Sequence, residues 1–243
     1  MPDLIIVHLY ADLLRTYGDR GNVLALARRA EWRRFSVRVD EVSVGQPLPR
    51  GPGLILIGGG TDRVQGAIST DLLARRSQLL EATRAGAVLV GICGGYQLLG
   101  RRYVTADGTP LEGLGLLDIE TTGSSGGHRI IGRVRARASL WGRGFELVGF
   151  ENHGGRTSLG PDALPLARVR KGRGNNGVDR GEGAVQGSVV GTYLHGPVLP
   201  SNPRLADSLL GRALAARIGE SRLEGLDDEL EDRAHADARS LRR

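Results

Sequence analysis

The sequence is poor in several kinds of residue, and each shortage argues against a class of protein. One cysteine in 243 residues cannot form an internal disulfide, so we expect a reduced, cytoplasmic protein. No stretch of about 18 apolar residues is present, so no membrane-spanning helix is expected. The first residues also lack the basic, apolar and small-residue order of a secretory signal.

Lysine is nearly absent, and this shortage has a chemical consequence. Lys171 is the only lysine among the 33 basic residues, and it stands between Arg170 and Gly172. A P-loop requires Gly-Lys followed by Ser or Thr, so the sequence has no Walker A motif. We therefore expect no cofactor on this chain. If its reaction consumes ATP and Mg²⁺, another chain is expected to bind them.

Aromatic side chains are scarce as well, at 4% of the residues. Nucleic-acid-binding surfaces combine clustered basic residues with aromatic side chains that stack on bases. Here the arginines are scattered and interleaved with acids, although the formal net charge is +6. No nucleic-acid partner is expected, whereas a broadly basic surface favours an anionic substrate or an acidic protein partner.

The abundant feature is apolar sequence in short runs separated by glycines. In the first half, strand patterns alternate with helix patterns, which predicts an α/β fold with a three-layer, doubly wound, mostly parallel sheet. A helix stop at Gly86 and an N-cap at Thr70 are the clearest boundary signals. The expected strands are 4–9, 35–42, 54–57 and 87–92, and the expected helices are 23–32 and 71–85.

The second half has strand patterns joined by glycine-rich turns and few helix signals. We expect these segments to add antiparallel strands to the same sheet, before a helix over 204–218. One domain over residues 1–219 is predicted, followed by a charged tail over 220–243 that is helical or partly disordered. The added strands are expected at 114–120, 129–138, 145–151, 166–170 and 185–193.

The single cysteine directly follows one of the apolar runs, in Gly91-Ile92-Cys93-Gly94-Gly95. A strand, a glycine-pinched turn and a helix start would lift its thiol out of the sheet, as in a nucleophile elbow. A helix N-terminus and a nearby histidine both favour the reactive thiolate. The Gly94 N–H and a glycine of the loop 58–60 are candidate oxyanion donors. The spacing alone fits a buried structural cysteine equally well.

Five histidines are available as the base that a cysteine nucleophile needs. His195 ends an apolar strand pattern, where side chains emerge at the edge of a sheet, so it is the preferred candidate. His153 is second, on position alone. A histidine at the end of a strand is also common as a hydrogen-bonded structural residue, so position by itself does not assign the base.

Several segments, taken in order, resemble class I glutamine amidotransferases. They are the glycine loop 58–60, the elbow 91–97 and His195. Residues 149–153 are similar to the cobyric acid synthase-like branch of that family. Within this branch, segments 9–10, 16–22, 58–63 and 193–197 resemble the glutaminase subunits of lipid II isoglutaminyl synthases. The resemblance extends from about residue 4 to about residue 210.

The resemblance implies a glutaminase that works through a cysteine thioester. Cys93 would attack the side-chain amide of L-glutamine. His195 would protonate the departing ammonia and then activate water, while Gly94 and Gly59 would hold the oxyanion. Gln97 and Arg129 would bind glutamine, Arg129 through the α-carboxylate, although a structural role for Arg129 fits as well. No metal site is implied.

The resemblance also implies a partner. Ammonia would pass, within a heterodimer, to a MurT-like Mur ligase subunit. That subunit would use ATP to amidate D-glutamate to D-isoglutamine in lipid II, during peptidoglycan synthesis. This chain would then meet the lipid substrate through its partner, at the inner face of the membrane. The absence of a P-loop agrees with this division of labour.

Pro197 departs from the pattern of many class I amidotransferases, which have an acid at that position, two residues after the histidine. The cobyric acid synthase-like branch lacks the acid too, so what orients His195 is left open. Glu151 is one candidate, with a surface or structural role as its alternative. Three other functions stay open: an amidotransferase for a cobyric acid-like or other carboxylate, a stand-alone γ-glutamyl hydrolase, and a noncatalytic binding subunit.

Overall fold

The computed structural model describes residues 2–14, 18–124, 126, 128–195, 197–219 and 223–240. Its central element is a six-stranded sheet in the order β13-β14-β4-β3-β1-β2. All neighbours from β14 to β2 pair in parallel, and β13 alone is antiparallel. The bounds are β1 (Leu4–Leu9), β2 (Val37–Val42), β3 (Leu54–Ile57), β4 (Val88–Ile92), β13 (Ala184–Gln186) and β14 (Val189–Thr192).

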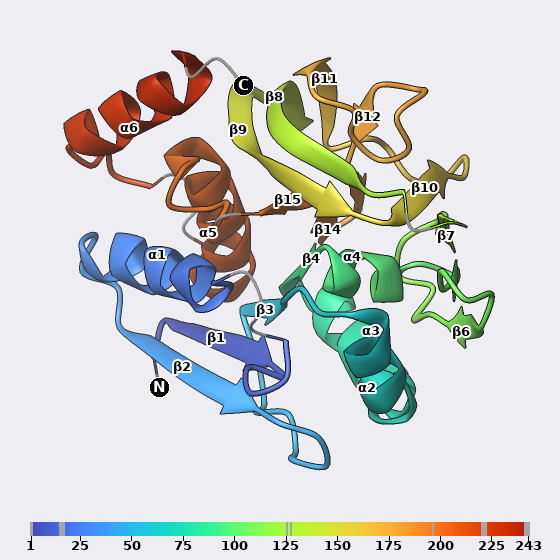
Figure 1. Ribbon diagram of the computed structural model, residues 1–243. Helices are drawn as coiled ribbons and strands as arrows, with labels where there is room; N and C mark the ends of the chain where they lie inside the picture. The colour runs from blue at the N-terminus through green and yellow to red at the C-terminus, as the bar shows by residue number, and fades with distance from the viewer. Residues whose placement is uncertain are drawn as a thin grey trace.

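Helices cover both faces of this sheet (Figure 1). α1 (Arg20–Glu31) and α5 (Pro203–Ile218) lie on one side, and α2 (Asp62–Ala74), α3 (Arg76–Arg84) and α4 (Gly94–Leu99) lie on the other. Strands β1, β3 and β4 are buried along their whole length. This explains their unbroken apolar sequence, because a parallel strand between two helix layers has no solvent face. The predicted three-layer, doubly wound α/β fold is confirmed.

The helix predicted over 71–85 differs from the structure at its start and in its middle. It begins at Asp62, with Thr61 at its N-cap position and Thr70 inside it. It also ends at Ala74, and a second helix, α3, runs from Arg76 to Arg84. The buried face of α2 runs through Gln65, Ile68 and Leu72 at helical spacing. Burial of that face carries the helix through Gly66, a residue of low helix propensity.

The prediction that the later strands extend the same sheet is also wrong, except for β13 and β14, which together cover the segment expected at 185–193. The others form a four-stranded sheet, β10-β7-β5-β6, and a five-stranded sheet, β12-β11-β8-β9-β15. β8 and β9 pair along their whole length and form a separate sheet. Their residues alternate between buried and exposed, so one face of this sheet meets solvent, unlike the central parallel strands. The bounds are β5 (Arg102–Val104), β6 (Pro110–Glu112), β7 (Ile119–Gly123), β8 (Ile130–Leu140), β9 (Arg143–His153), β10 (Gly155–Leu159), β11 (Ala167–Lys171), β12 (Gly181–Glu182) and β15 (Leu194–His195).

The chain crosses between the sheets just after β14. β14 ends at Thr192, beside Ile92 of β4, whereas β15 pairs with β9 in the five-stranded sheet. The short segment from Thr192 to His195 therefore joins the parallel sheet to the antiparallel one. This crossing brings the end of β4, which precedes Cys93, close to the strand that carries His195.

The charged tail forms a helix, α6 (Glu229–Ser240), which has no buried residue. Polar contacts attach it to the rest of the molecule: Arg239 pairs with Glu146 at 2.7 Å, and His235 Nδ1 donates to the Ser201 carbonyl at 2.8 Å. The tail predicted over 220–243 is thus helical over Glu229–Ser240, and residues 220–222 and 241–243 lie outside the described part. Across the described ranges, we find no helix with the length and apolar character needed to cross a membrane.

Candidate active site

The predicted elbow around Cys93 is present. β4 ends at Ile92, α4 begins at Gly94, and Cys93 between them has φ +50° and ψ −102°. A non-glycine residue at positive φ is strained, and such residues cluster at functional sites. The turn has no room for larger neighbours, since a Cβ on Gly95 would clash with the Ile57 carbonyl oxygen. The glycines of Gly-Ile-Cys-Gly-Gly therefore let the turn pack directly against the end of β3.

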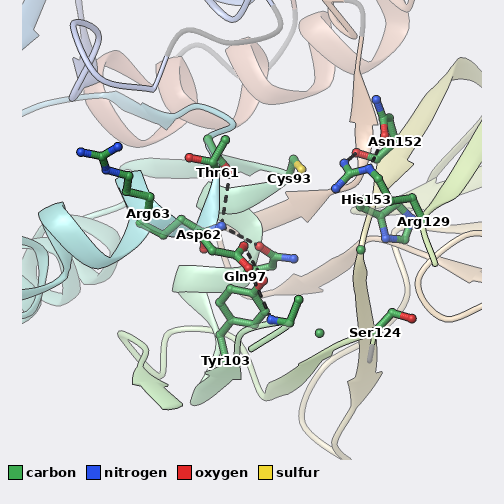
Figure 2. A pocket seen from close by; sticks show the side chains of 15 residues that line it. Thr61, Asp62, Arg63, Cys93, Gln97, Tyr103, Ser124, Arg129, Asn152 and His153 are labelled. Carbon is green, nitrogen blue, oxygen red and sulfur yellow. Dashed lines mark hydrogen bonds between the residues drawn. The ribbon is translucent and has the colours of Figure 1, made fainter. Parts of the chain in front are cut away.

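Cys93 lines a cavity of about 500 Å³. Figure 2 shows α2 and α4 residues on one side of it, residues around β8 and β9 on the other, and Cys93 between them. The first side includes Thr61, Asp62, Arg63 and Gln97, and the second includes Arg129, Asn152 and His153. The cavity thus brings together three residues predicted from the sequence: Cys93, Gln97 and Arg129.

Burial determines the protonation state of the cysteine. Cys93 is 7% exposed, and desolvation raises the pKa of its thiol to about 12. The Arg129 charge and the Gly94 N–H lower this pKa, and the Asp19 carboxylate raises it. Burial outweighs the stabilisation of the thiolate that the sequence suggested, so Cys93 is a neutral thiol at pH 7 in the chain alone.

His195 lies on β15, three residues after Thr192, whose backbone contacts Cys93. The Cys93 N–H donates to the Thr192 carbonyl at 2.8 Å. Burial and the Arg129 charge lower the pKa of His195 to about 4, so its imidazole is neutral at pH 7. The side chain lines a second cavity, of about 270 Å³, together with Arg133, Phe150 and Ser201.

His153, the second candidate base, is held as part of the cavity wall. Its Nδ1 donates to the Gly155 carbonyl at 2.9 Å, which makes Nε2 the unprotonated nitrogen. The ring stacks on Tyr193, with ring centroids 3.7 Å apart and planes 8° apart. Burial lowers the pKa of His153 to about 3. The His153 ring is therefore neutral and fixed in place. This agrees with the alternative that a histidine at the end of a strand has a structural role.

Gln97 lies between two further polar side chains at the cavity. Its Oε1 accepts from Gln65 Nε2 at 3.0 Å, and its Nε2 donates to the Tyr193 hydroxyl at 3.2 Å. The same hydroxyl bonds to Thr157 Oγ1 at 2.7 Å. Gln65 was not singled out from the sequence. The only available signal was a polar residue at the spacing of the buried face of α2.

Arg129 is exposed and is held at the cavity by one neighbour. Its Nε donates to Asn152 Oδ1 at 2.8 Å, and its Nη2 donates to the Asn152 carbonyl at 2.7 Å. The charge of Arg129 lowers the pKa of both Cys93 and His195. A fixed guanidinium beside a neutral thiol suits an anionic group of a substrate, as expected for Arg129. Asn152, which fixes it, is a second residue that sequence reasoning missed.

The glycine loop offers a different donor from the one expected. The Gly59 N–H donates to the buried Asp19 Oδ2 at 2.8 Å, so it is not available to an oxyanion. The Gly60 N–H has no acceptor among the described residues. A Cβ placed on Gly94 would lie 3.0 Å from the Gly60 nitrogen, so the Gly60 amide adjoins Gly94. The geometry supports Gly94 with Gly60, in place of Gly59.

The residue that orients His195 was left open, and the structure removes one candidate. Glu151 accepts the Arg173 and Gly174 N–H groups at 2.9 and 2.8 Å, so its carboxylate holds the loop after β11. Residues 16, 17 and 196, which belong to the resembling segments, lie outside the described residues. Within the described ranges, no group of three or more His, Cys, Asp or Glu residues could hold a metal ion.

Comparisons with known proteins agree with this geometry. The family model for the CobB/CobQ-like glutamine amidotransferase domain matches residues 5–203. Lipid II isoglutaminyl synthase (glutamine-hydrolyzing) subunit GatD of Staphylococcus aureus is 39% identical over 96% of this chain and 94% of its own length. The GatD subunit of Streptococcus pneumoniae is also 39% identical, over 89% of this chain and 83% of its own length.

More distant matches share part of the sequence or only the fold. Cobyric acid synthase of Mesorhizobium japonicum is 39% identical over 66% of this chain, which spans 32% of that protein. Among solved structures, PurLQS from Thermotoga maritima has a TM-score of 0.58 and 18% identity, with 90% of this chain and 98% of the other covered. The glutaminase domain of Trypanosoma brucei CTPS has a TM-score of 0.53 and 11% identity, with 91% and 98% covered. The structural likenesses show the α/β fold.

Proposed function

The chain belongs to the CobB/CobQ-like glutamine amidotransferase family, and from this membership we propose that it is the glutamine-hydrolysing subunit of a lipid II isoglutaminyl synthase. The observation that carries the proposal is the similarity to a GatD subunit over nearly the whole of both chains. The position of Cys93 agrees with it: a strained elbow that lines a cavity facing a fixed arginine.

In the first half of the reaction, glutamine binds with its α-carboxylate on Arg129, and Cys93 Sγ attacks the side-chain carbonyl carbon. The thiol proton moves to the imidazole of His195, which is neutral at pH 7 and so able to accept it. The negative oxygen of the tetrahedral intermediate receives hydrogen bonds from the Gly94 and Gly60 N–H groups. The carbon–nitrogen bond then breaks, His195 returns its proton to nitrogen, and ammonia leaves a thioester on Cys93.

In the second half, water attacks the thioester carbonyl, and His195 takes a proton from that water. The carbon–sulfur bond breaks, the proton returns to Cys93 Sγ, and glutamate is released. Gln97 takes part in binding the substrate glutamine in the cavity. Gln65 and Tyr193 hold the side-chain amide of Gln97 in place.

The ammonia is consumed by a second subunit, a MurT-like Mur ligase that forms a heterodimer with this chain. That subunit binds ATP and Mg²⁺, activates the D-glutamate carboxylate of lipid II and amidates it to D-isoglutamine. The complex works in the cytoplasm, at the inner face of the membrane where the lipid-linked acceptor lies. The absence of a Walker A motif in this chain supports such a division between subunits.

The proposal is tested by purifying this chain together with the candidate ligase and supplying glutamine labelled with ¹⁵N in its side-chain amide. We expect glutamate release and, with ATP and lipid II, mass-spectrometric transfer of the label to the stem peptide. Glutamate release without transfer to lipid II, from an associated and folded pair, would overturn the acceptor and leave the glutaminase. Absence of both would overturn the proposed function.

A further inference from the structure

Asp19 is a buried acid at the start of α1 that does not cap the helix. It occupies the N-cap position of α1, where an aspartate side chain usually accepts a hydrogen bond from its own helix. The Asp19 carboxylate makes no such cap bond and is 1% exposed. No ion pair with a cation is recorded for it in the described part of the chain. Burying an acid in this way is unfavourable, and the mechanism above gives Asp19 no task.

The carboxylate instead starts a chain of hydrogen bonds between two distant segments. Its Oδ2 accepts the Gly59 N–H at 2.8 Å, and its Oδ1 accepts from Asn22 Nδ2 at 3.3 Å. Asn22 Oδ1 in turn accepts the Leu199 N–H at 2.8 Å. All of these groups are buried. Asp19 at the N-cap of α1 and Asn22 in its first turn therefore connect the glycine loop to the segment that follows His195.

Packing reinforces the same connection. A Cβ placed on Gly21 would lie 2.7 Å from Pro197 Cγ, so Pro197 sits directly on the first turn of α1. On its other side the segment is held by Asn202, whose Nδ2 donates to the Val198 carbonyl at 2.7 Å. Pro197 stands at the position that is an acid in many class I glutamine amidotransferases, two residues after the histidine. Here this position serves as a packing contact with α1.

We propose that Asp19 and Asn22 are positioning residues, which hold the oxyanion-binding glycine loop and the segment after His195 in one fixed arrangement. This inference rests on the proposed glutaminase function and extends it to residues that do not touch the substrate. With the Gly59 N–H bound to Asp19, the next amide in the loop, that of Gly60, is left beside Gly94 for the oxyanion. A displacement of about 1 Å in such a donor can reduce a rate by about 10²-fold.

The test compares Asp19→Ala, Asp19→Asn and Asn22→Ala in the complex with the ligase subunit. Asp19→Ala frees the Gly59 N–H, so we expect kcat for glutamine hydrolysis to fall by about 10- to 100-fold. KM is expected to change by less than about threefold, because Arg129 and Asn152 are untouched. Asp19→Asn keeps one acceptor for Gly59 and should lose less kcat. Asn22→Ala breaks the link to Leu199 and should fall between the two.

The pH profile of Cys93 alkylation by iodoacetamide provides a second readout. A variant that is only less stable is not expected to move this profile to lower pH. The reaction needs the thiolate but no oxyanion donor. Because the Asp19 charge raises the pKa of the thiol, removing it should move the alkylation profile to lower pH in both Asp19 variants, while kcat falls. Asn22→Ala keeps the charge and should keep the wild-type profile.

The matched control is Asp118→Ala. Asp118 is also a buried aspartate that accepts a backbone N–H, that of Asp162, at 3.0 Å, and it does not line the Cys93 cavity. It differs from Asp19 in pairing with Arg101, at 2.9 Å, so its loss should cost at least as much stability. Wild-type kcat is expected for it. Wild-type kcat in Asp19→Ala, or an equal loss in Asp118→Ala, would overturn the positioning role and leave the glutaminase function intact. If Asp19→Ala does not fold, the kcat and alkylation profile of Asp19→Asn and Asn22→Ala decide. A wild-type complex that hydrolyses no glutamine overturns the proposed function, and this inference with it.

Discussion

The two walls of the Cys93 cavity are built in different ways. The nucleophile wall is made of the loop 58–60, β4 and α4. Around Cys93 it is held by backbone bonds: Cys93 N–H to the Thr192 carbonyl at 2.8 Å, and Gly95 N–H to the Gly58 carbonyl at 3.1 Å. Asp19 adds the one side-chain bond argued above, to the Gly59 N–H of the loop. The histidine wall, made of Arg129 and the end of β9 with Asn152 and His153, relies on side chains. Arg129 is held by Asn152, and the His153 ring by Tyr193 and Gly155.

This difference predicts how each wall responds to substitution. Backbone bonds do not depend on side-chain identity, so a substitution at Cys93 should remove chemistry and leave the wall in place. In the histidine wall the same side chains hold the structure together and line the cavity where the substrate is proposed to bind. Substitutions there should therefore alter glutamine binding, the pKa of Cys93 and His195, and stability together. The experiments below test this contrast, from the largest expected effect to the smallest.

Replacing the nucleophile should have the largest effect. We expect Cys93→Ala to lower the rate of glutamine hydrolysis by about 10⁴-fold or more, since no other group can form the thioester. Its melting temperature should stay close to that of the wild type. Cys93→Gly should be equally inactive but melt higher than Cys93→Ala, because glycine adopts φ +50° without strain. Glutamate release and calorimetry measure both effects; full activity in Cys93→Ala would exclude the elbow as the reaction centre.

Substitutions of His195 and His153 should lower kcat for glutamine hydrolysis by different amounts. His195→Asn is expected to lower kcat by about 10²- to 10⁴-fold, the range for losing a general acid–base group. His153→Phe keeps the stack on Tyr193 but loses the bond to the Gly155 carbonyl, at a cost of about 1 kcal/mol in unfolding free energy. Its kcat should fall by less than about tenfold. The reverse order of the two kcat values would assign the base to His153.

Arg129 should affect binding and ionisation together. Arg129→Gln is expected to raise KM for glutamine by about 10- to 100-fold, through loss of a charged hydrogen-bonding partner. Removing the cation should raise the pKa of both Cys93 and His195, so alkylation of Cys93 should need a higher pH. Arg129→Lys keeps the charge but loses the paired contacts with Asn152, so it should raise KM with a nearly unchanged alkylation profile. An unchanged KM in Arg129→Gln would reduce Arg129 to a structural role.

Glu182 should give the smallest effect on activity and a measurable one on stability. Burial raises its pKa to about 7, above the unfolded value of about 4.5. Its contribution to stability is therefore full below pH 4.5 and is lost as pH rises through 7. We expect the wild type to lose about 1–3 kcal/mol of unfolding free energy between pH 5 and 8.

The control for this effect is Glu182→Gln. Its Oε1 can still accept the Thr192 hydroxyl and the Tyr193 N–H, which bond to Glu182 at 2.8 Å each. This variant should show a smaller dependence of its urea midpoint on pH, with kcat within about threefold of the wild type. A wild-type pH dependence in the variant would assign the effect to another group.

The nucleophile wall could be predicted well from the sequence, and the histidine wall less well. The elbow, its glycines and the parallel strands depend on residues that are neighbours in sequence. The sequence analysis chose Gly59 over Gly60 as the oxyanion donor, and it could not foresee that the Gly59 N–H is bound to Asp19, 40 residues away. The separate antiparallel sheets were missed for a similar reason: strand patterns show which residues face inward and leave the partner strand undetermined.

The sequence by itself determined the α/β fold, the elbow at Cys93 and the family resemblance that led to a glutaminase. These follow from local backbone preferences and from ordered motifs. Only the tertiary structure decided the ionisation of Cys93 and His195, the stacked role of His153, the use of Glu151 in a loop and the links through Asp19 and Asn22. Each of these depends on desolvation or on hydrogen bonds between segments far apart in the chain, which exist only after the sheets have come together.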